Sequence, residues 1–246
     1  MTIAVASSTA VARTPLLMEA AALTKRYGDQ QALAAVSFDV RAGEVLGLIG
    51  PNGAGKTTLL EALAGLLPID AGEVRWRGSP VGHRRDEVFY LPDGLRPWED
   101  QFVVRALGFF ASVYGRTDGQ VAQTVHAVGL APVLGKRVAA LSKGYGRRLM
   151  LALALITPQP LLLMDEPFDG FDLRQTREVM ALLRRVAANG RTLVLAIHQL
   201  PDAERVCDRF VLLAGGTVRG AGTLDELRAK ADLPSAGLED VFLALT

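Results

Sequence analysis

A glycine-rich segment constrains this chain more than any other part of its sequence. It reads Gly50-Pro51-Asn52-Gly53-Ala54-Gly55-Lys56-Thr57-Thr58 and fits the G-x-x-x-x-G-K-[ST] phosphate-binding pattern. The apolar run at 45–49 before it predicts a buried strand, and residues 59–67 after it predict a helix. Because a strand, a glycine loop and a helix in this order bind a nucleoside triphosphate, the sequence favours that function over a structural turn.

Each part of this loop has an expected role in phosphate binding. Glycines let successive backbone N–H groups curl round phosphate oxygens, and the positive end of the following helix points at the anion. Lys56 is expected to neutralise charge on the β- and γ-phosphates, and the Thr57 hydroxyl to bind Mg²⁺. The predicted nucleotide-binding residues of the loop are Gly50, Asn52, Gly53, Ala54, Gly55, Lys56, Thr57 and Thr58.

Two carboxylates follow a second apolar run. Residues 161–164 are Leu-Leu-Leu-Met and lead into Asp165 and Glu166. Such a run suits a central parallel strand covered on both faces, so Asp165 is expected to emerge beside the phosphates and bind Mg²⁺. Glu166 is placed to polarise the attacking water or to accept its proton. A solvated acidic turn is the alternative, which the glycine loop upstream disfavours.

The order of these motifs resembles the nucleotide-binding subunit of an ATP-binding cassette (ABC) transporter. Between them, Leu141-Ser142-Lys143-Gly144-Tyr145 is similar to the family signature Leu-Ser-Gly-Gly-Gln. In the family this segment opens a helix that meets ATP held by a second subunit, so that two chains enclose two nucleotides. The resemblance therefore implies that Ser142 and Gly144 contact ATP in trans, and a hydroxyl and a bare N–H at a helix start suit an anion.

The signature also departs from the family pattern. Lys143 stands in place of the first glycine, and Tyr145 in place of glutamine. Lys143 either reinforces phosphate binding or faces solvent, and we favour the solvent-facing alternative because a lysine stem can extend outward from many backbone positions.

Three further segments resemble parts of the family's nucleotide site. Residues 168–172 occupy the place of its D-loop, and His198, after the apolar run at 193–197, matches its switch histidine. That imidazole is expected to hold the water together with Glu166. Upstream, Tyr27 matches the aromatic residue that stacks on adenine, a contact worth roughly 1–3 kcal/mol per base.

Asp93 is the departure with most mechanistic weight, since the family carries a glutamine there that senses Mg²⁺ and the membrane partner. A carboxylate binds magnesium well, but it adds negative charge close to Asp165 and Glu166. Asp93 is therefore either a metal ligand or turned outward, and residues 93–100 are the expected coupling loop in both cases.

The expected fold class is α/β. It comprises a P-loop NTPase core, with a mostly parallel sheet and an antiparallel β flank, and an inserted α-helical subdomain at about 93–158. Helical spacing at 102–110 and 121–128, broken by glycines at 115, 119, 129 and 135, predicts that insertion. Residues 1–17 are expected to form a flexible extension, and 18–246 one ABC nucleotide-binding domain.

Composition excludes several classes of protein. The net charge is only +1 and Lys and Arg are not clustered, which argues against nucleic acid as a ligand. No apolar run approaches the roughly 18 residues of a membrane-spanning helix, and no export signal is recognisable at the start. The single cysteine, Cys207, fits a reducing cytosol and a buried apolar role.

Three functions fit the resemblance. The first is the ATP-hydrolysing motor of a transporter, bound peripherally at the cytoplasmic face of the membrane to a separate integral permease and paired with a second cassette subunit. The Ser-Lys-Gly signature and residues 237–246 look like those of bacterial ABC-2 type exporter subunits, which favours export. A soluble scaffold ATPase and a regulatory subunit with little turnover are the alternatives. Leu238, Val241, Phe242 and Leu245 form an apolar stripe that suits packing on the core.

Overall fold

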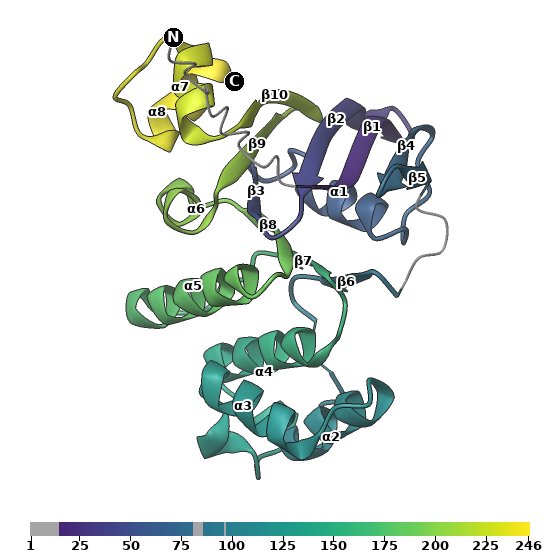
Figure 1. Cartoon of the computed structure of the whole chain (residues 1–246), viewed down its shortest axis with the longest axis vertical. Helices are drawn as coiled ribbons and strands as arrows, with labels where there is room; N and C mark the ends of the chain where they lie inside the picture. The colour runs from purple at the N-terminus through teal and green to yellow at the C-terminus, as the bar shows by residue number, and fades with distance from the viewer. Residues whose placement is uncertain (1–14, 81–85, 96) are drawn as a thin grey trace, which may run out of the picture.

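A six-stranded sheet forms the centre of the molecule (Figure 1). The computed structural model describes residues 15–80, 86–95 and 97–246. The strand order is β10-β9-β3-β8-β7-β6, and all neighbours are parallel except β10, which pairs with β9 in the antiparallel sense. The strands are β3 (Val45–Ile49), β6 (Val88–Leu91), β7 (Leu161–Asp165), β8 (Thr192–Ile197), β9 (Arg209–Ala214) and β10 (Thr217–Gly222).

Alternate residues of the central strands enter two different cores. In β8, Leu193, Leu195 and Ile197 pack in one core, and Val194 and Ala196 pack in the other. Successive side chains of a strand point to opposite faces, so a strand that is apolar throughout needs cover on both sides. This confirms the prediction that the apolar runs are buried central strands.

A second, antiparallel sheet covers one face. Its strand order is β2-β1-β4-β5, and it encloses one core together with helix α1 (Lys56–Leu63). The predicted antiparallel flank is thus confirmed. Its strands are β1 (Leu16–Tyr27), β2 (Gln30–Arg41), β4 (Ala71–Trp76) and β5 (Ser79–Pro80).

Helices cover the other face and extend away from it. Three of these α-helices come between β6 and β7 in the sequence, and they form the lower part of Figure 1. In space, α5 lies between them and the sheet. A single core continues from the sheet through α4 and α5 into α2 and α3. The helices are α2 (Val103–Val113), α3 (Asp118–Val128), α4 (Lys143–Ile156), α5 (Leu173–Ala188), α6 (Leu200–Val206), α7 (Leu224–Ala231) and α8 (Leu238–Leu245), with short 3₁₀ turns η1 (Ala131–Val133) and η2 (Val138–Ala140).

Three predicted boundaries were wrong. The N-terminal extension does not reach residue 17, because β1 begins at Leu16 and Leu17 is buried; residues 1–14 lie outside the described part. Helix α1 ends at Leu63 instead of residue 67, because Gly65 takes a left-handed φ of 68° that stops the helix. Gly119 does not break a helix but lies in the first turn of α3, which a capping box at Thr117 starts.

The C-terminal stripe packs on the protein itself. Leu238 and Val241 of α8 are buried, and Phe242 and Leu245 lie partly buried against the same core. Cys207 is also buried and free, and burial raises the pKa of its thiol. Both findings agree with packing roles.

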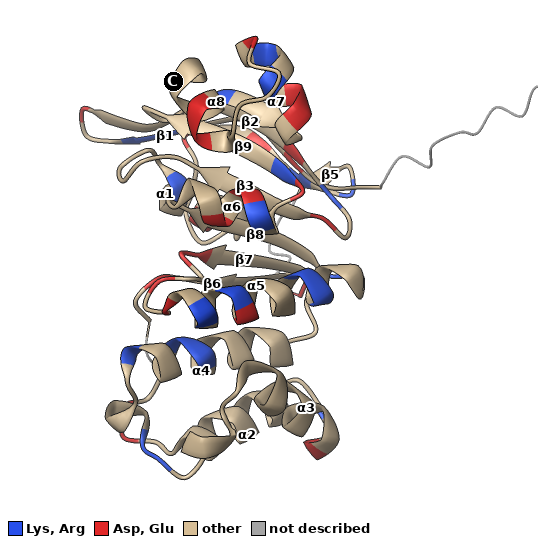
Figure 2. Cartoon of the chain, turned by 90° about the vertical axis from the view of Figure 1, so that its left-hand side faces the viewer, with Lys and Arg blue, Asp and Glu red and all other residues tan. Residues whose placement is uncertain are grey.

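Charged residues are distributed unevenly over the helices. Basic and acidic segments are interspersed along α5, α6 and α7 (Figure 2), whereas α2 is almost free of charge. Among the described residues, no helix is both long and apolar enough to cross a bilayer.

The double cover of the sheet predicts a large stability effect at its centre. Leu195→Ala, at a fully buried position of β8, is expected to lower the free energy of unfolding by about 2–5 kcal/mol. Leu243→Ala, at a position 68% exposed on α8, is the matched control and is expected to change it by less than about 0.5 kcal/mol. Urea denaturation measures both. A similar small loss in the two variants would contradict the assignment of β8 to the core.

Candidate nucleotide site

The glycine loop between β3 and α1 leaves no room for side chains at two of its positions. A Cβ at Gly50 would lie 2.4 Å from the Leu213 carbonyl oxygen, and a Cβ at Gly55 would lie 2.5 Å from the Ala32 carbonyl oxygen. Gly55 also has a φ of 102°, which L side chains rarely adopt. The loop is therefore pressed between β9 and β2 with its backbone exposed to the space in front of α1.

Two side chains at the start of α1 reach the neighbouring elements. The Lys56 ammonium donates to the carbonyl oxygens of Gly50 at 2.8 Å and Pro51 at 3.3 Å. The Thr57 hydroxyl donates to the Asp165 carboxylate at 2.6 Å. The glycine loop and the carboxylates after β7, which are more than a hundred residues apart in sequence, thus meet directly.

Glu166 connects the ammonium to the histidine that follows β8. One of its carboxylate oxygens lies 3.9 Å from the Lys56 ammonium, and the other lies 2.6 Å from the Nδ1 of His198. Glu166 adopts a φ of 47°, an uncommon conformation for a residue with a side chain and one that is found at functional sites.

Burial shifts the ionisation of these groups. Burial raises the pKa of Glu166, although the hydrogen bond and charge of His198 and the charge of Lys56 act to lower it. Burial also raises the pKa of Asp165, although the hydrogen bond from Thr57 acts to lower it. The charge of Asp93 adds to the increase at Asp165. Burial also lowers the pKa of Lys56, while the two carboxylates oppose that change. Each charge is thus poorly hydrated and depends on its partners.

One cavity of about 410 Å³ collects most of the predicted residues. The ring of Tyr27 is half exposed at this cavity. Gln30 and Ala32 of β2 also line it, and no motif in the sequence points to them apart from their closeness to Tyr27. The predicted residues that line the cavity are Tyr27, Asn52, Gly53, Gly55, Lys56, Thr57, Thr58, Asp93, Asp165 and Glu166.

Other predicted residues lie outside this lining. Gly50 and Ala54 form the base of the loop, and His198 joins the site through Glu166. Ser142 and Gly144 lie at the start of α4, where the Ser142 hydroxyl caps the helix by accepting from the Tyr145 N–H at 3.4 Å. They do not border the cavity of their own chain.

Asp93 is held by an arginine that no sequence motif predicts. Its carboxylate, half exposed, accepts a hydrogen bond from the buried Arg147 of α4. The Arg147 guanidinium also donates to the Asp169 carbonyl oxygen at 3.2 Å, and the exposed Lys143 ammonium pairs with the Asp169 carboxylate at 2.9 Å. Asp93 is thus paired with a positive charge near Asp165. The exposed Lys143 side chain confirms the solvent-facing alternative.

The oxygen atoms fit a small divalent cation whose remaining ligands come from phosphate and water. Thr57 Oγ1 and Asp165 Oδ2 lie 2.6 Å apart, close to the roughly 2.9 Å between neighbouring ligands of octahedral Mg²⁺. The described residues contain no cluster of three or more acidic, histidine or cysteine side chains that could hold a metal unaided. A nucleotide-bound Mg²⁺ needs only one or two protein ligands.

The pairing of Asp93 with Arg147 predicts energetic coupling. Asp93→Asn and Arg147→Gln, singly and together, are expected to give a coupling free energy of about 1 kcal/mol or more in urea unfolding, because each single variant strands its partner. The exposed pair Arg174 and Glu178 on α5 is the control, with an expected coupling of about 0.3–0.5 kcal/mol. Additive effects at Asp93 and Arg147 would contradict the pairing.

The raised pKa of Glu166 predicts a pH dependence of stability. A carboxyl whose pKa is higher in the folded state favours folding when protonated, and that contribution is lost as pH rises through the folded pKa. Glu166→Gln cannot ionise, so its unfolding free energy relative to the wild type is expected to rise as the pH increases above the ordinary Glu pKa of about 4.3. A difference that stays constant or falls over this range would show that the Glu166 carboxylate is not destabilised by burial.

Comparison with known proteins places the chain in a family. Residues 33–169, more than half of the chain, match the family "ABC transporter". The Nod factor export ATP-binding protein I of Burkholderia lata is 39% identical over 207 residues, which cover 78% of this chain and 66% of that protein. The probable multidrug ABC transporter ATP-binding protein YbhF of Escherichia coli is 31% identical over 240 residues, which cover 93% of this chain and 41% of that protein.

A solved structure described as the ATP-binding subunit of an ABC transporter superposes with a TM-score of 0.85 at 30% identity. The match covers 93% of this chain and 99% of that one. The glycine loop, the paired carboxylates and the histidine thus lie in a fold shared with known ATP-binding subunits. This chain belongs to the ABC transporter family and is an ATP-binding, ATP-hydrolysing domain of that family.

Proposed function

We propose that the chain is the motor subunit of an ABC exporter. In this role it pairs with a second cassette subunit around ATP and Mg²⁺ and drives a separate integral permease from the cytoplasmic face of the membrane. The observation that carries the proposal is the contact of Thr57 with Asp165, and of Glu166 with both Lys56 and His198, around one cavity. Relatives named for Nod factor export and for multidrug transport support the direction.

The residues divide the work of hydrolysis between them. Loop N–H groups and Lys56 would bind the phosphates, and Thr57 and Asp165 would hold Mg²⁺, which would supply charge neutralisation. Glu166, fixed by His198, orients the attacking water and accepts its proton, and its raised pKa brings it closer to the working pH of a general base. The exposed ring of Tyr27 is available to stack on the base.

The positions of Ser142 and Gly144 support a dimer. Both lie at the N-terminus of α4, where the hydroxyl and the N–H groups suit an anion, yet they do not border their own cavity. A second chain that presents its own nucleotide to this helix start would use them, and ATP would then hold two chains together.

The helical insertion offers a surface for the permease. Trp98 and Phe109 are about half exposed and meet edge to face, with ring centroids 5.1 Å apart. They line a groove of about 400 Å³ together with Gln101, Arg105 and Ala106. An exposed aromatic groove on a nearly uncharged helix suits an apolar segment of a partner. Trp98 lies five residues after Asp93 in the chain, so a movement of Asp93 would have a short path to the groove.

Isolation of the chain from its own membranes tests the proposal. The tagged chain, solubilised in mild detergent, is expected to carry a stoichiometric multi-span membrane protein that mass spectrometry identifies. A variant with Trp98→Ala and Phe109→Ala is expected to lose that protein, and Leu66→Ala, which also removes an exposed apolar side chain, is expected to keep it. Recovery without any membrane protein would contradict the motor and favour the scaffold ATPase.

The dimer makes a separate prediction. Glu166→Gln is expected to bind ATP normally but to lose at least about a hundredfold in hydrolysis, and therefore to accumulate as an ATP-bound dimer in light scattering. Adding Ser142→Ala to this variant is expected to weaken the dimer without changing ATP binding by the monomer. Rapid hydrolysis by Glu166→Gln, or an ATP-bound dimer indifferent to Ser142, would overturn these two roles.

A further inference from the structure

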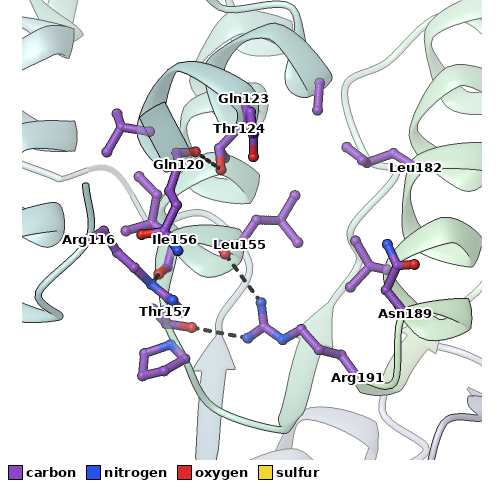
Figure 3. A pocket seen from close by; sticks show the side chains of 14 residues that line it. Arg116, Gln120, Gln123, Thr124, Leu155, Ile156, Thr157, Leu182, Asn189 and Arg191 are labelled. Carbon is purple, nitrogen blue, oxygen red and sulfur yellow. Dashed lines mark hydrogen bonds between the residues drawn. The ribbon is translucent and has the colours of Figure 1, made fainter. Parts of the chain in front are cut away.

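Another cavity lies near the amino ends of β7 and β8, whereas the nucleotide site lies at the carboxyl ends of the central strands. It has a volume of about 350 Å³ and lies where α4 ends and where β7 and β8 begin. Arg116, from the turn between α2 and α3, and Arg191, from the turn between α5 and β8, face it from two sides. Figure 3 shows the two guanidinium groups pointing toward each other across the end of α4. We call this space the basic cavity.

Both guanidinium groups are fixed in place by backbone oxygens at the end of α4. Arg116 Nε donates to the Ile156 carbonyl oxygen at 2.7 Å. Arg191 donates to the Leu155 carbonyl oxygen at 3.3 Å, to the Gln159 carbonyl oxygen at 2.8 and 3.0 Å, and to the Thr157 hydroxyl at 3.2 Å. Neither side chain needs to move to present its charge to the cavity.

The charge in the basic cavity is not balanced. Among the described residues, neither arginine has a carboxylate partner within ion-pair distance, and no acidic residue lines the cavity. The C-terminus of α4 supplies only about half a negative charge, against two whole positive ones. Burial and the charge of Arg116 lower the pKa of Arg191 to about 10, so it stays charged at neutral pH.

Hydrogen-bond donors remain unused around these charges. The two terminal NH₂ groups of Arg116 make no hydrogen bond to any residue in the described part of the chain. Gln120 uses its side-chain oxygen to cap α3, which leaves its amide NH₂ available, and the Asn189 amide faces the same space. Capping of α4 accounts for one nitrogen of Arg116, but it does not account for the other donors.

We infer that the basic cavity binds a small anion carrying a phosphate or carboxylate group. Guanidinium forks match both groups, because two parallel N–H donors can bond two oxygens of either one. Apolar side chains such as Val121 and Leu182 line the rest of the cavity, so an organic body attached to the anion has room. A bound anion would connect Arg116 of the helical insertion to Arg191 of the sheet core and thereby hold the two together.

Residue-resolved titration of the full chain tests this site. Isotopically labelled protein is titrated with inorganic phosphate and, separately, with succinate, while backbone amide resonances are followed. Saturable shifts are expected at Gln120, Thr157 and Arg191 with at least one probe, and the probe that acts distinguishes phosphate from carboxylate recognition. Phosphate at the glycine loop is expected to shift Gly53 and Lys56 instead, so the two sites are told apart.

Variants assign the binding to the arginines. Arg116→Gln is expected to weaken binding at the basic cavity about tenfold or more without affecting phosphate shifts at Gly53. Arg116→Lys keeps the charge but loses the fork, and is expected to bind with intermediate affinity. Arg219→Gln, which removes an exposed arginine elsewhere, is the charge-matched control. Absence of saturable shifts at Thr157 and Arg191, or equal affinity in Arg116→Gln and Arg219→Gln, would overturn the inference.

Discussion

Parallel hydrogen bonding of β3, β8 and β7 brings the chemistry of this protein to one place. Each of these strands is followed by a functional segment: the glycine loop after β3, His198 after β8, and Asp165 with Glu166 at the end of β7. Because β8 pairs with both of the other strands, His198 follows the strand next to β7 and comes within reach of Glu166. The strands hold these segments only while both faces of the sheet are buried, so the two cores that stabilise the fold also fix the site.

Electrostatic pairing joins this rigid edge to the helical insertion. Asp93 follows β6, Arg147 belongs to α4, and Asp169 follows β7, and the guanidinium of Arg147 contacts both acidic residues. The carboxylates of Asp93 and Asp169 would repel one another, and Arg147 offsets that repulsion. The same guanidinium ties the helix that begins with the signature to the loop expected to face the permease.

Much of this architecture could be predicted from the sequence. Apolar runs that are buried on both faces gave the central strands to within a residue or two, and the contiguous motifs gave Lys56, Thr57, Asp165 and Glu166. The contact between Asp93 and Arg147 could not be predicted, because it joins residues 54 apart and depends on how α4 packs on the loop after β6. Gln30 and Ala32 were missed because β2 reaches the cavity only through the packing of the second sheet.

Helix and domain boundaries were predicted less well for local reasons. A glycine ends a helix when the chain needs a left-handed residue, as at Gly65, but is accepted in a first turn that is capped by its neighbours, as at Gly119. The predicted extension at 1–17 included the first two residues of β1, and only the pairing of β1 with β2 and β4 makes this segment a strand. Residues whose role depends on tertiary contacts are thus the ones that a single sequence does not predict.

The affinity of the purified chain for Mg-ATP, with and without the loop lysine, tests the nucleotide site most directly. Isothermal titration of the wild type, Lys56→Ala and the exposed-lysine control Lys136→Ala makes the comparison. A charge-assisted contact to phosphate predicts that Lys56→Ala binds at least about tenfold more weakly than both others. Equal affinity in all three proteins would contradict the placement of the phosphates against the glycine loop. It would also contradict the assignment of the cavity as a nucleotide site.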